Sequence, residues 1–256
     1  MSCRLGSSRQ AHPGARNPRS RRLMCVIAEE THGVVSDEVS GSASLRSHRA
    51  ADCFAGLPMA QAALKFASAR HANQYREIDH APFIVHPIEV GRLLQCDGQP
   101  DEVIAAGLLH DVLEKTATTT AELHSRFGAR IARLVETVSD DPSIGDYEGR
   151  KRRLRDRVAH AGSETFAIFA ADKISKVREL ALLPTSRLEE ATTRAKLAHY
   201  RASLEMLRRV DRDVSLVDLL DPELTRLNAA RSPKLTTPKR SRAPRARSTP
   251  ASRPPK

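Results

Sequence analysis

Two imidazoles and two carboxylates stand out as side chains that could bind a metal ion. His110 and Asp111 are adjacent in the apolar stretch "AAGLLHDVLEKT" (105–116), His86 lies in "PFIVHP", and Asp172 follows the apolar run "TFAIFAA". All four are hard or borderline ligands, and together they suit Mn²⁺, Fe²⁺ or Zn²⁺. A divalent ion lowers the pKa of a water that it binds, so this set indicates metal-assisted hydrolysis.

The spacing of these residues restricts where a metal could lie. Neighbours on a helix point about 100° apart, so His110 and Asp111 can reach one ion only if it lies close to their helix, in a cleft. His86 and Asp172 would then supply the remaining ligands from other helices. Glu114 lies four residues after His110, on the same helix face, and could hold a water beside the ion without binding the ion itself.

Each residue also has a simpler interpretation. A single histidine inside a helix is more often a packed, hydrogen-bonded side chain than a ligand. Asp172 next to Lys173 could form a surface ion pair of little energetic value, and Glu114 could be an exposed helix residue. The case for a metal site therefore depends on the combination and its order along the chain.

The sequence predicts that the segments which carry these side chains are helices. Pro87 fits a first helical turn and restrains His86 to an extended conformation. No sustained alternation typical of strands is present, so we expect a compact all-α domain of about 170 residues, in the usual range for one domain. The predicted helices cover 57–75, 87–95, 101–115, a short helix capped by Thr119 and Glu122 and ended by Gly128, 129–140, 147–160, 164–180, and a long helix from a capping box at Ser186 and Glu189 to about Arg209.

Composition divides the chain into four parts. We expect a disordered N-terminal extension at 1–57, the helical domain at 58–212, a helical remnant or linker at 213–230, and a basic, proline-rich disordered tail at 231–256. The formal net charge of +11 comes from the two ends, since 1–22 hold six arginines and 231–256 hold nine Lys and Arg, with no acid in either. The basic tails could contact nucleic acid, but only nonspecifically and in a salt-sensitive manner.

The four cysteines indicate whether the protein works in a reducing or an oxidising compartment. They are scattered without a Cys-x-x-Cys pair, which favours reduced thiols over a disulfide frame or a zinc knuckle. No apolar stretch is long enough for a membrane span. We therefore expect a cytoplasmic protein with no membrane partner.

Six segments, taken in their order along the chain, resemble a known family. They are "FASARHANQYR", "PFIVHPIEVGRLL", "AAGLLHDVLEKT", "LHSRFGARIARLVETVSDD", "GRKRRL" and "ADKISKVREL". They resemble the HD-type metal phosphohydrolases, and among these the hydrolase domain of the Rel/Spo alarmone enzymes and their small stand-alone relatives. The resemblance implies an HD-domain helical bundle that uses Mn²⁺, or another divalent metal, to remove the 3′-pyrophosphate from ppGpp or pppGpp. It places the metal ligands on His86, His110, Asp111 and Asp172, and implies a structural role for His71.

Residues around the implied substrate partly depart from the family pattern. Glu114, which would manage the attacking water, is retained, whereas Lys115 replaces the aspartate that usually follows it. Glu77 replaces the lysine of an Arg-Lys pair, and Lys176 replaces an asparagine. The resemblance implies a catalytic role for Glu114 and substrate binding by Arg76 and Tyr200. Lys115 and Lys176 depart from the family pattern, but both add positive charge, which could bind phosphate directly.

The sequence is compatible with several functions. The substrate could be the alarmone or another nucleotide or phosphate ester, and the altered residues are also compatible with a weak or inactive relative. A nucleotide sensor without turnover and a nucleic-acid-associated protein are further alternatives. The oligomeric state is not indicated by the sequence.

Overall fold

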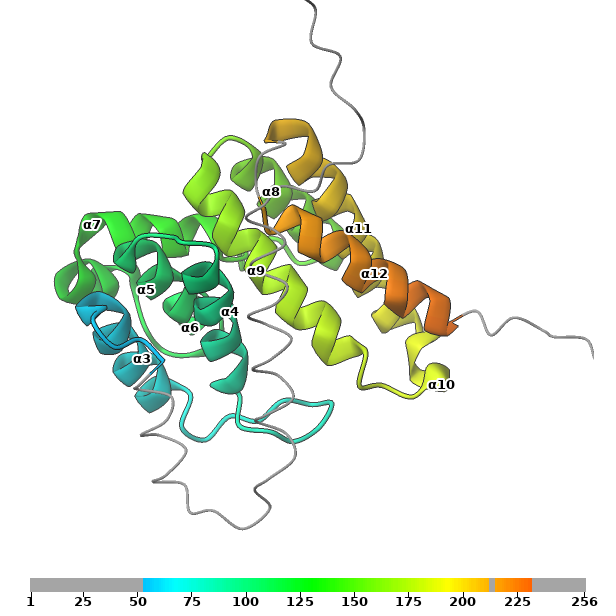
Figure 1. Cartoon of the computed structure of the whole chain (residues 1–256), viewed down its shortest axis with the longest axis horizontal. Helices are drawn as coiled ribbons and strands as arrows, with labels where there is room; N and C mark the ends of the chain where they lie inside the picture. Colours follow the sequence, from blue (N-terminus) through cyan, green and yellow to red (C-terminus); the bar gives the residue numbers. More distant parts are fainter. Residues whose placement is uncertain (1–52, 212–214, 232–256) are drawn as a thin grey trace, which may run out of the picture.

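The computed structural model describes residues 53–211 and 215–231, and these ranges are helical (Figure 1). Within them no strand forms; an isolated antiparallel bridge joins Tyr75 and Pro82. The predicted all-α fold is therefore confirmed. Most of the two tails expected at 1–57 and 231–256 lies outside the described residues. The helices are α3 (Pro58–Arg70), α4 (Val85–Cys96), α5 (Asp101–Leu109), α6 (Val112–Lys115), α7 (Thr120–Val138), α8 (Tyr147–Ala159), α9 (Ser163–Leu180), α10 (Thr185–Leu188), α11 (Ala191–Val210) and α12 (Val217–Arg231).

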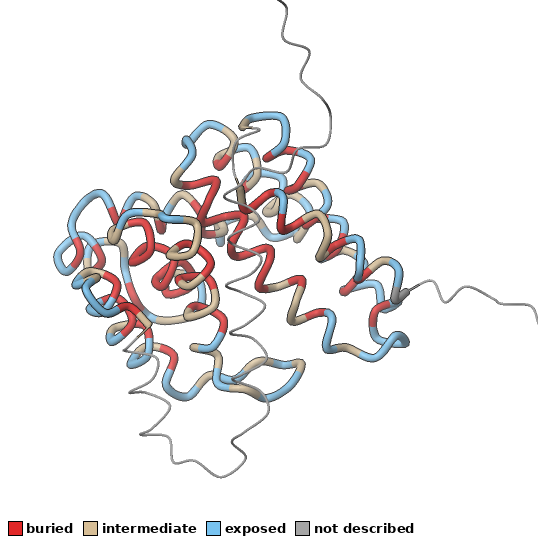
Figure 2. Tube along the Cα trace, in the orientation of Figure 1, coloured by how far each residue is buried: buried red, intermediate tan, exposed pale blue. Residues whose placement is uncertain are grey.

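Helix α9 passes through the middle of the molecule. Helices α4, α5 and α7 pack on one side of it, and α11 and α12 pack on the other (Figure 1). Every residue from Thr165 to Ser175 is buried, and Figure 2 shows this run of burial along the helix. The sequence "TFAIFAADKIS" explains it, because a helix that is apolar on all faces must be covered on all faces. As a result α9 carries the charged residues Asp172 and Lys173 into the interior.

Helix α5 is the second fully covered element, and it packs tightly on α4. Its residues Val103–Leu109 are all buried. A Cβ atom at Gly107 would clash with Cδ1 of Leu94 and force that buried side chain to shift, so glycine favours this close approach of the two helices. The contact brings the start of α4, with His86, toward the end of α5, with His110.

The predicted helix over 101–115 is interrupted, so the expectation that His110 and Asp111 lie in the middle of a helix is wrong. Helix α5 ends at Leu109, α6 begins at Val112, and the His-Asp pair forms the turn between them. The carbonyl of Gly107, which a continuous helix would offer to the amide of Asp111, accepts a hydrogen bond from Nδ1 of His110 at 2.8 Å. His110 and Asp111 keep right-handed helical backbone angles within this turn.

The start of α4 also differs from the prediction. His86 lies inside the helix, at its second position, with Pro87 at the third. The expected extended conformation of His86 is therefore wrong. Proline is tolerated at this position because the first four amides of a helix have no partner within the helix.

The predictions of helix ends from local sequence are partly correct. The side chain of Thr119 accepts a hydrogen bond from the amide of Glu122 at 3.2 Å, which confirms the predicted cap. Gly128 has φ 83° and interrupts α7, as predicted. The capping box at Ser186 is wrong, because Ser186 lies within the single turn α10 and the long helix begins at Ala191, without a side-chain cap.

The C-terminal part of the described chain is packed against the domain. Helix α12 lies on α9 and α11 and buries a row of leucines there. The buried leucines in and next to α12 are Leu216, Leu219, Leu220, Leu224 and Leu227.

None of the described helices is both long and apolar enough to cross a lipid bilayer.

Candidate metal centre

Four side chains predicted as metal ligands come together in the interior. The Nε2 atoms of His86 and His110 are 3.1 Å apart. Oδ1 of Asp172 lies 3.3 Å from the first nitrogen and 3.4 Å from the second. Oδ2 of Asp111 lies 3.6 Å from both. The donors come from α4, from the α5–α6 turn and from α9, and all four residues are buried.

The hydrogen bonds of the two rings determine which nitrogen carries the proton. Nδ1 of His110 faces a carbonyl, which can only accept, so this nitrogen must be the protonated one. Nδ1 of His86 lies 2.8 Å from Oγ of Ser175, and the hydroxyl proton of Ser175 is donated to Oε2 of Glu89 at 2.6 Å. The hydroxyl oxygen therefore accepts from His86. In the neutral rings both Nε2 atoms present lone pairs to the same point, which is the arrangement of histidines that bind a metal.

Two carboxylate oxygens at this point are buried and accept no hydrogen bond of good geometry. They are Oδ2 of Asp111 and Oδ1 of Asp172, the same atoms that approach the imidazoles. Buried polar atoms normally have partners. Two lone-pair nitrogens and two such oxygens are a donor set that fits a divalent cation, so the residues present fit the metal implied by the sequence.

The surrounding charges keep both carboxylates ionised. Burial by itself would raise the pKa of Asp111, but the charges of Lys176 and His110 hold it below its ordinary value. Burial would likewise raise the pKa of Asp172, and Lys173 and Lys176 hold it well below its usual range. Both carboxylates are therefore present as charged oxygen donors in a buried place, where their attraction for a cation is strong.

The two histidines differ in their affinity for a proton. Burial lowers the pKa of His86 to about 4, more than the neighbouring carboxylates can compensate. Burial would also lower the pKa of His110, but the charge of Asp111 and the contact with Asp172 raise it. Of the two rings, His86 is therefore the one held more strongly in the neutral form.

Two lysines approach the carboxylate of Asp172 from opposite sides. Lys173, which is also buried, donates a hydrogen bond to Oδ2, and its ammonium lies 4.2 Å from the centroid of the Phe169 ring. The alternative of a surface ion pair is therefore wrong. Nζ of Lys176 lies 2.9 Å from Oδ1 of Asp172 and 3.9 Å from Oδ1 of Asp111, and its side chain is 27% exposed. Lys176 thus connects the ligand carboxylates to the protein surface.

Glu114 lies on α6, one turn after the His-Asp pair, with an exposed side chain. Its Oε1 accepts a hydrogen bond from the amide of Asp140 at 2.6 Å. Burial would lower the pKa of Lys176, and the charge of Glu114 is among those that raise it. Glu114 therefore lies close enough to Lys176 to act on its pKa, with its carboxylate held by the loop after α7.

Tyr200 on α11 faces the same centre. Burial raises the pKa of its phenol above the ordinary value, and the charges of Lys176 and Asp172 act on it directly. This makes Tyr200 a neighbour of the ligand carboxylates and of Lys176.

The two remaining predicted substrate residues lie in other surroundings. Arg76 is bound to Asp79 within the loop between α3 and α4. The ammonium of Lys115 lies 5.1 Å from the centroid of the Phe83 ring, which is itself 5.8 Å from the ring of His86. The structure therefore brings Lys115 near the edge of the centre, whereas Arg76 has its own ion pair.

His71 lies in surroundings that suit the structural role implied by the sequence resemblance. It is buried, and its Nδ1 contacts Oε1 of Gln74 at 2.7 Å. The amide of Gln74 in turn donates to the carbonyl of Lys115 at 2.6 Å. This link connects the loop before α4 to α6.

Sequence reasoning missed Ser175, which contacts Nδ1 of His86, and Glu89, which accepts a hydrogen bond from Ser175. Glu89 follows His86 by three residues and Ser175 follows Asp172 by three. This spacing puts each on the same helix face as a ligand. This spacing is the feature of the sequence that could have indicated Glu89 and Ser175, but many surface residues share it.

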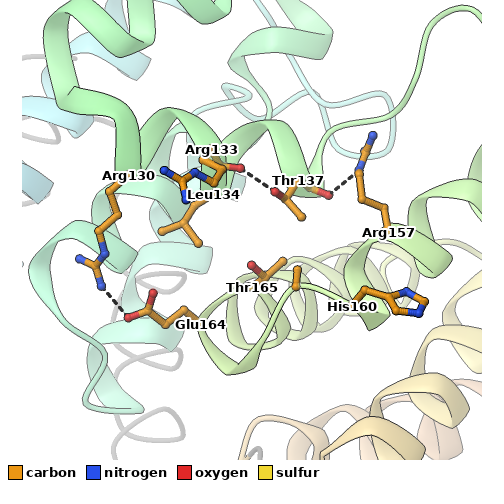
Figure 3. A pocket seen from close by; sticks show the side chains of 9 residues that line it. Arg130, Arg133, Leu134, Thr137, Arg157, His160, Glu164 and Thr165 are labelled. Carbon is orange, nitrogen blue, oxygen red and sulfur yellow. Dashed lines mark hydrogen bonds and ion pairs between the residues drawn. The ribbon is translucent and has the colours of Figure 1, made fainter.

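A separate cavity of about 570 Å³ lies between α7, the end of α8 and the start of α9 (Figure 3). It contains none of the predicted site residues. Arg130 is paired with Glu164 and Glu102, and Arg157 donates to the carbonyls of Thr137 and Ser139. These two guanidinium groups are therefore occupied by the protein itself. The lining residues are Arg130, Arg133, Leu134, Thr137, Arg157, His160, Ala161, Glu164 and Thr165.

Comparison with known proteins places the chain in a family. Residues 63–181 match the family described as "HD domain". A protein of Danio rerio named guanosine-3′,5′-bis(diphosphate) 3′-pyrophosphohydrolase MESH1 is 40% identical over 120 residues, which are 46% of this chain and 66% of that protein. The human protein of the same name is 36% identical over 121 residues, covering 46% of this chain and 67% of that protein. The chain belongs to the MESH1-type HD-domain family.

A solved structure agrees with this assignment to the MESH1-type family. It is titled "A metazoan ortholog of SpoT hydrolyzes ppGpp and plays a role in starvation responses". The match has a TM-score of 0.57 at 26% identity and covers 67% of this chain and 96% of that chain. The predicted resemblance to the Rel/Spo hydrolases and their small relatives is thus confirmed. The chain spans about two thirds of the length of the two named MESH1 relatives.

Proposed function

We propose that the chain is a metal-dependent phosphohydrolase that removes the 3′-pyrophosphate from guanosine tetra- or pentaphosphate. The observation that supports this best is the convergence of the Nε2 atoms of His86 and His110 with two buried carboxylate oxygens, from Asp111 and Asp172, in a MESH1-type domain. We expect the protein to act on this nucleotide in the cytoplasm.

The proposed metal is Mn²⁺, although the donor set also suits other divalent ions. His86, His110, Asp111 and Asp172 would hold it. Once bound, the ion supplies a Lewis acid that polarises a phosphoryl oxygen and makes hydroxide available near neutral pH.

The protein's own residues perform the remaining work. Glu114 accepts a proton from the attacking water, and the water oxygen forms a bond to phosphorus. The bond from that phosphorus to the ribose 3′ oxygen breaks, pyrophosphate is released, and the 3′ oxygen takes up a proton from solvent to become the hydroxyl. The ammonium of Lys176 balances charge on the phosphoryl oxygens. Tyr200 lies along the bound nucleotide, and Lys115 and Arg76 contact its phosphates, Arg76 after leaving Asp79.

A second substrate class is favoured by the charges around the centre. Glu77 is exposed in the loop next to Arg76 and would repel a polyphosphate there. Lys176, in contrast, places its charge directly at the ligand carboxylates. The same hydrolytic step on another nucleotide or on a simple phosphate ester is therefore the alternative.

A substrate screen tests the proposal. The full chain is stripped of metal with EDTA, reloaded with Mn²⁺, and incubated with ppGpp, common nucleotides and p-nitrophenyl phosphate. We expect release of pyrophosphate from ppGpp that depends on added metal. Faster turnover of another ester would support the alternative, and no turnover of any phosphate ester would contradict the proposed function.

A further inference from the structure

A chain of polar contacts leads from His86 away from the metal centre to helix α12. Nδ1 of His86 lies 2.8 Å from Oγ of Ser175, which donates to Oε2 of Glu89 at 2.6 Å. The other oxygen of Glu89 accepts from Nη1 of Arg178 at 2.9 Å. Nε of Arg178 donates to Oε1 of Glu223 on α12 at 3.1 Å. Three helices, α4, α9 and α12, are thus joined behind one ligand (Figure 1).

The chemistry of these groups fixes the direction of every hydrogen bond. A guanidinium group can only donate, so both carboxylates beside Arg178 are acceptors. The single proton of the Ser175 hydroxyl is directed to Glu89, which leaves its oxygen to accept from His86. His86 must then carry its proton on Nδ1.

The network is well protected from water. The side chain of Ser175 is buried, and those of Glu89 and Arg178 are 25% and 22% exposed. Burial would lower the pKa of Arg178, but the charges of Glu89 and Glu223 raise it. Arg178 therefore remains a permanent cation that keeps Glu89 oriented as an acceptor.

We propose that Glu89 and Ser175 are positioning residues for the metal, which fix His86 in the tautomer whose Nε2 lone pair faces the ion. This inference rests on the metal site of the proposed function. Without the acceptor at Ser175, the ring can carry its proton on Nε2, where it would donate to the carboxylate of Asp172 and oppose metal binding. Arg178 and Glu223 extend the same control to α12.

Metal titration of variants tests this role in the full chain. Ser175→Ala removes the acceptor, and Glu89→Gln offers Ser175 an amide donor that can reverse its hydrogen bond. Isothermal titration with Mn²⁺ should show affinity weakened by roughly 10–100-fold in both, the usual effect of losing such a partner. Ser175→Thr keeps the hydroxyl and should bind Mn²⁺ nearly as the unmodified protein does.

Ser203→Ala is the matched control. Ser203 is a fully buried serine that donates to the carbonyl of His199 at 2.8 Å, so its loss tests the general effect of removing a buried hydroxyl. We expect Ser203→Ala to lower thermal stability but to leave the affinity for Mn²⁺ unchanged. Equal weakening in Ser203→Ala and Ser175→Ala would overturn the proposal.

The tautomer of His86 can be measured in the metal-free protein. Imidazole ¹⁵N spectra of the EDTA-treated protein, assigned with a His86→Asn variant, should show an unprotonated Nε2 in His86. Ser175→Ala and Glu89→Gln should move this signal toward a mixture of tautomers. Unaltered spectra together with Mn²⁺ affinity within about twofold of the unmodified chain would overturn the inference. If the unmodified chain binds no Mn²⁺, the proposed function fails, and the ¹⁵N spectra alone decide whether Glu89 and Ser175 set the tautomer.

Discussion

At the scale of single residues, the metal centre is an arrangement of lone pairs that needs a positive charge. Two imidazole nitrogens 3.1 Å apart face each other and two ionised carboxylates. Lys176 partly meets this need, because its ammonium lies 2.9 Å from Oδ1 of Asp172. A bound divalent ion and the ammonium of Lys176 therefore compete for the same carboxylate.

Replacing Lys176 with asparagine tests this competition. Lys176→Asn should bind Mn²⁺ about tenfold more tightly, because a repulsive charge beside the ligands is removed. It should also raise the KM for a polyphosphate substrate, because a phosphate contact is lost. Lys65→Asn, at an exposed position of α3, is the control for loss of one charge. Unchanged or weaker metal binding in Lys176→Asn would show that the lysine does not compete with the ion.

The role of Glu114 can be separated from metal binding. Glu114→Gln removes the proposed proton acceptor but none of the metal donors. Its kcat should fall by roughly 10²–10⁴-fold, the usual contribution of base catalysis, while the metal content measured by elemental analysis stays the same. Glu136→Gln, an exposed change on α7, should have no effect on either quantity. Full activity of Glu114→Gln would rule out its role as base.

The metal ligands could be predicted from the sequence because imidazoles and carboxylates in apolar surroundings are unusual and occur here in a specific order. The orienting residues Ser175 and Glu89 could not be. Their role depends on a contact between side chains that are 86 residues apart. The interior position of Lys173 was also missed, since its burial follows from helices packing on all faces of α9.

At the scale of elements, the centre depends on the close approach of α4 and α5 and on the break between α5 and α6. Local sequence indicated the helices and the cap at Thr119, because both follow from nearest neighbours. The break could not be predicted, because it is stabilised by a bond between the ring of His110 and the backbone of Gly107. Helical periodicity carries no information on such a bond.

A Cβ atom at Gly107 should disturb this packing. Gly107→Ala forces the new methyl group against Leu94, and we expect the free energy of unfolding to fall by about 1–3 kcal/mol. Gly145→Ala is the control, because no atom lies within 4 Å of the corresponding Cβ position. Urea denaturation measures both variants. Equal stability of the two variants would mean that the contact between Gly107 and Leu94 leaves room for a methyl group.

At the scale of the whole molecule, buried neutral histidines make the fold sensitive to acid. His199 on α11 is buried, its Nδ1 accepts a hydrogen bond from Arg155 at 2.7 Å, and burial lowers its pKa well below the ordinary 6.5. His86 behaves in the same way, with a pKa of about 4. Both rings must therefore be neutral for the domain to be most stable.

The sign of the pH dependence follows from these lowered pKa values. Below about pH 6.5 the unfolded chain takes up protons on His199 and His86 that the folded protein refuses, so the free energy of unfolding decreases as the pH falls. The contribution of each ring is up to ~2 kcal/mol between pH 7.5 and 5. Urea denaturation in EDTA at these two pH values measures it. His199→Gln should show a smaller decrease than the unmodified protein, and an equal decrease would assign the effect to other groups.

The metal centre itself is tested most directly by isothermal titration of the EDTA-treated full chain with Mn²⁺. We predict one ion per chain, with binding weakened at least tenfold in both Asp172→Asn and His110→Gln and unchanged in Asp146→Asn, a carboxylate that caps α8. No binding to the unmodified chain, or equal binding by all three variants, would contradict a metal held by His86, His110, Asp111 and Asp172.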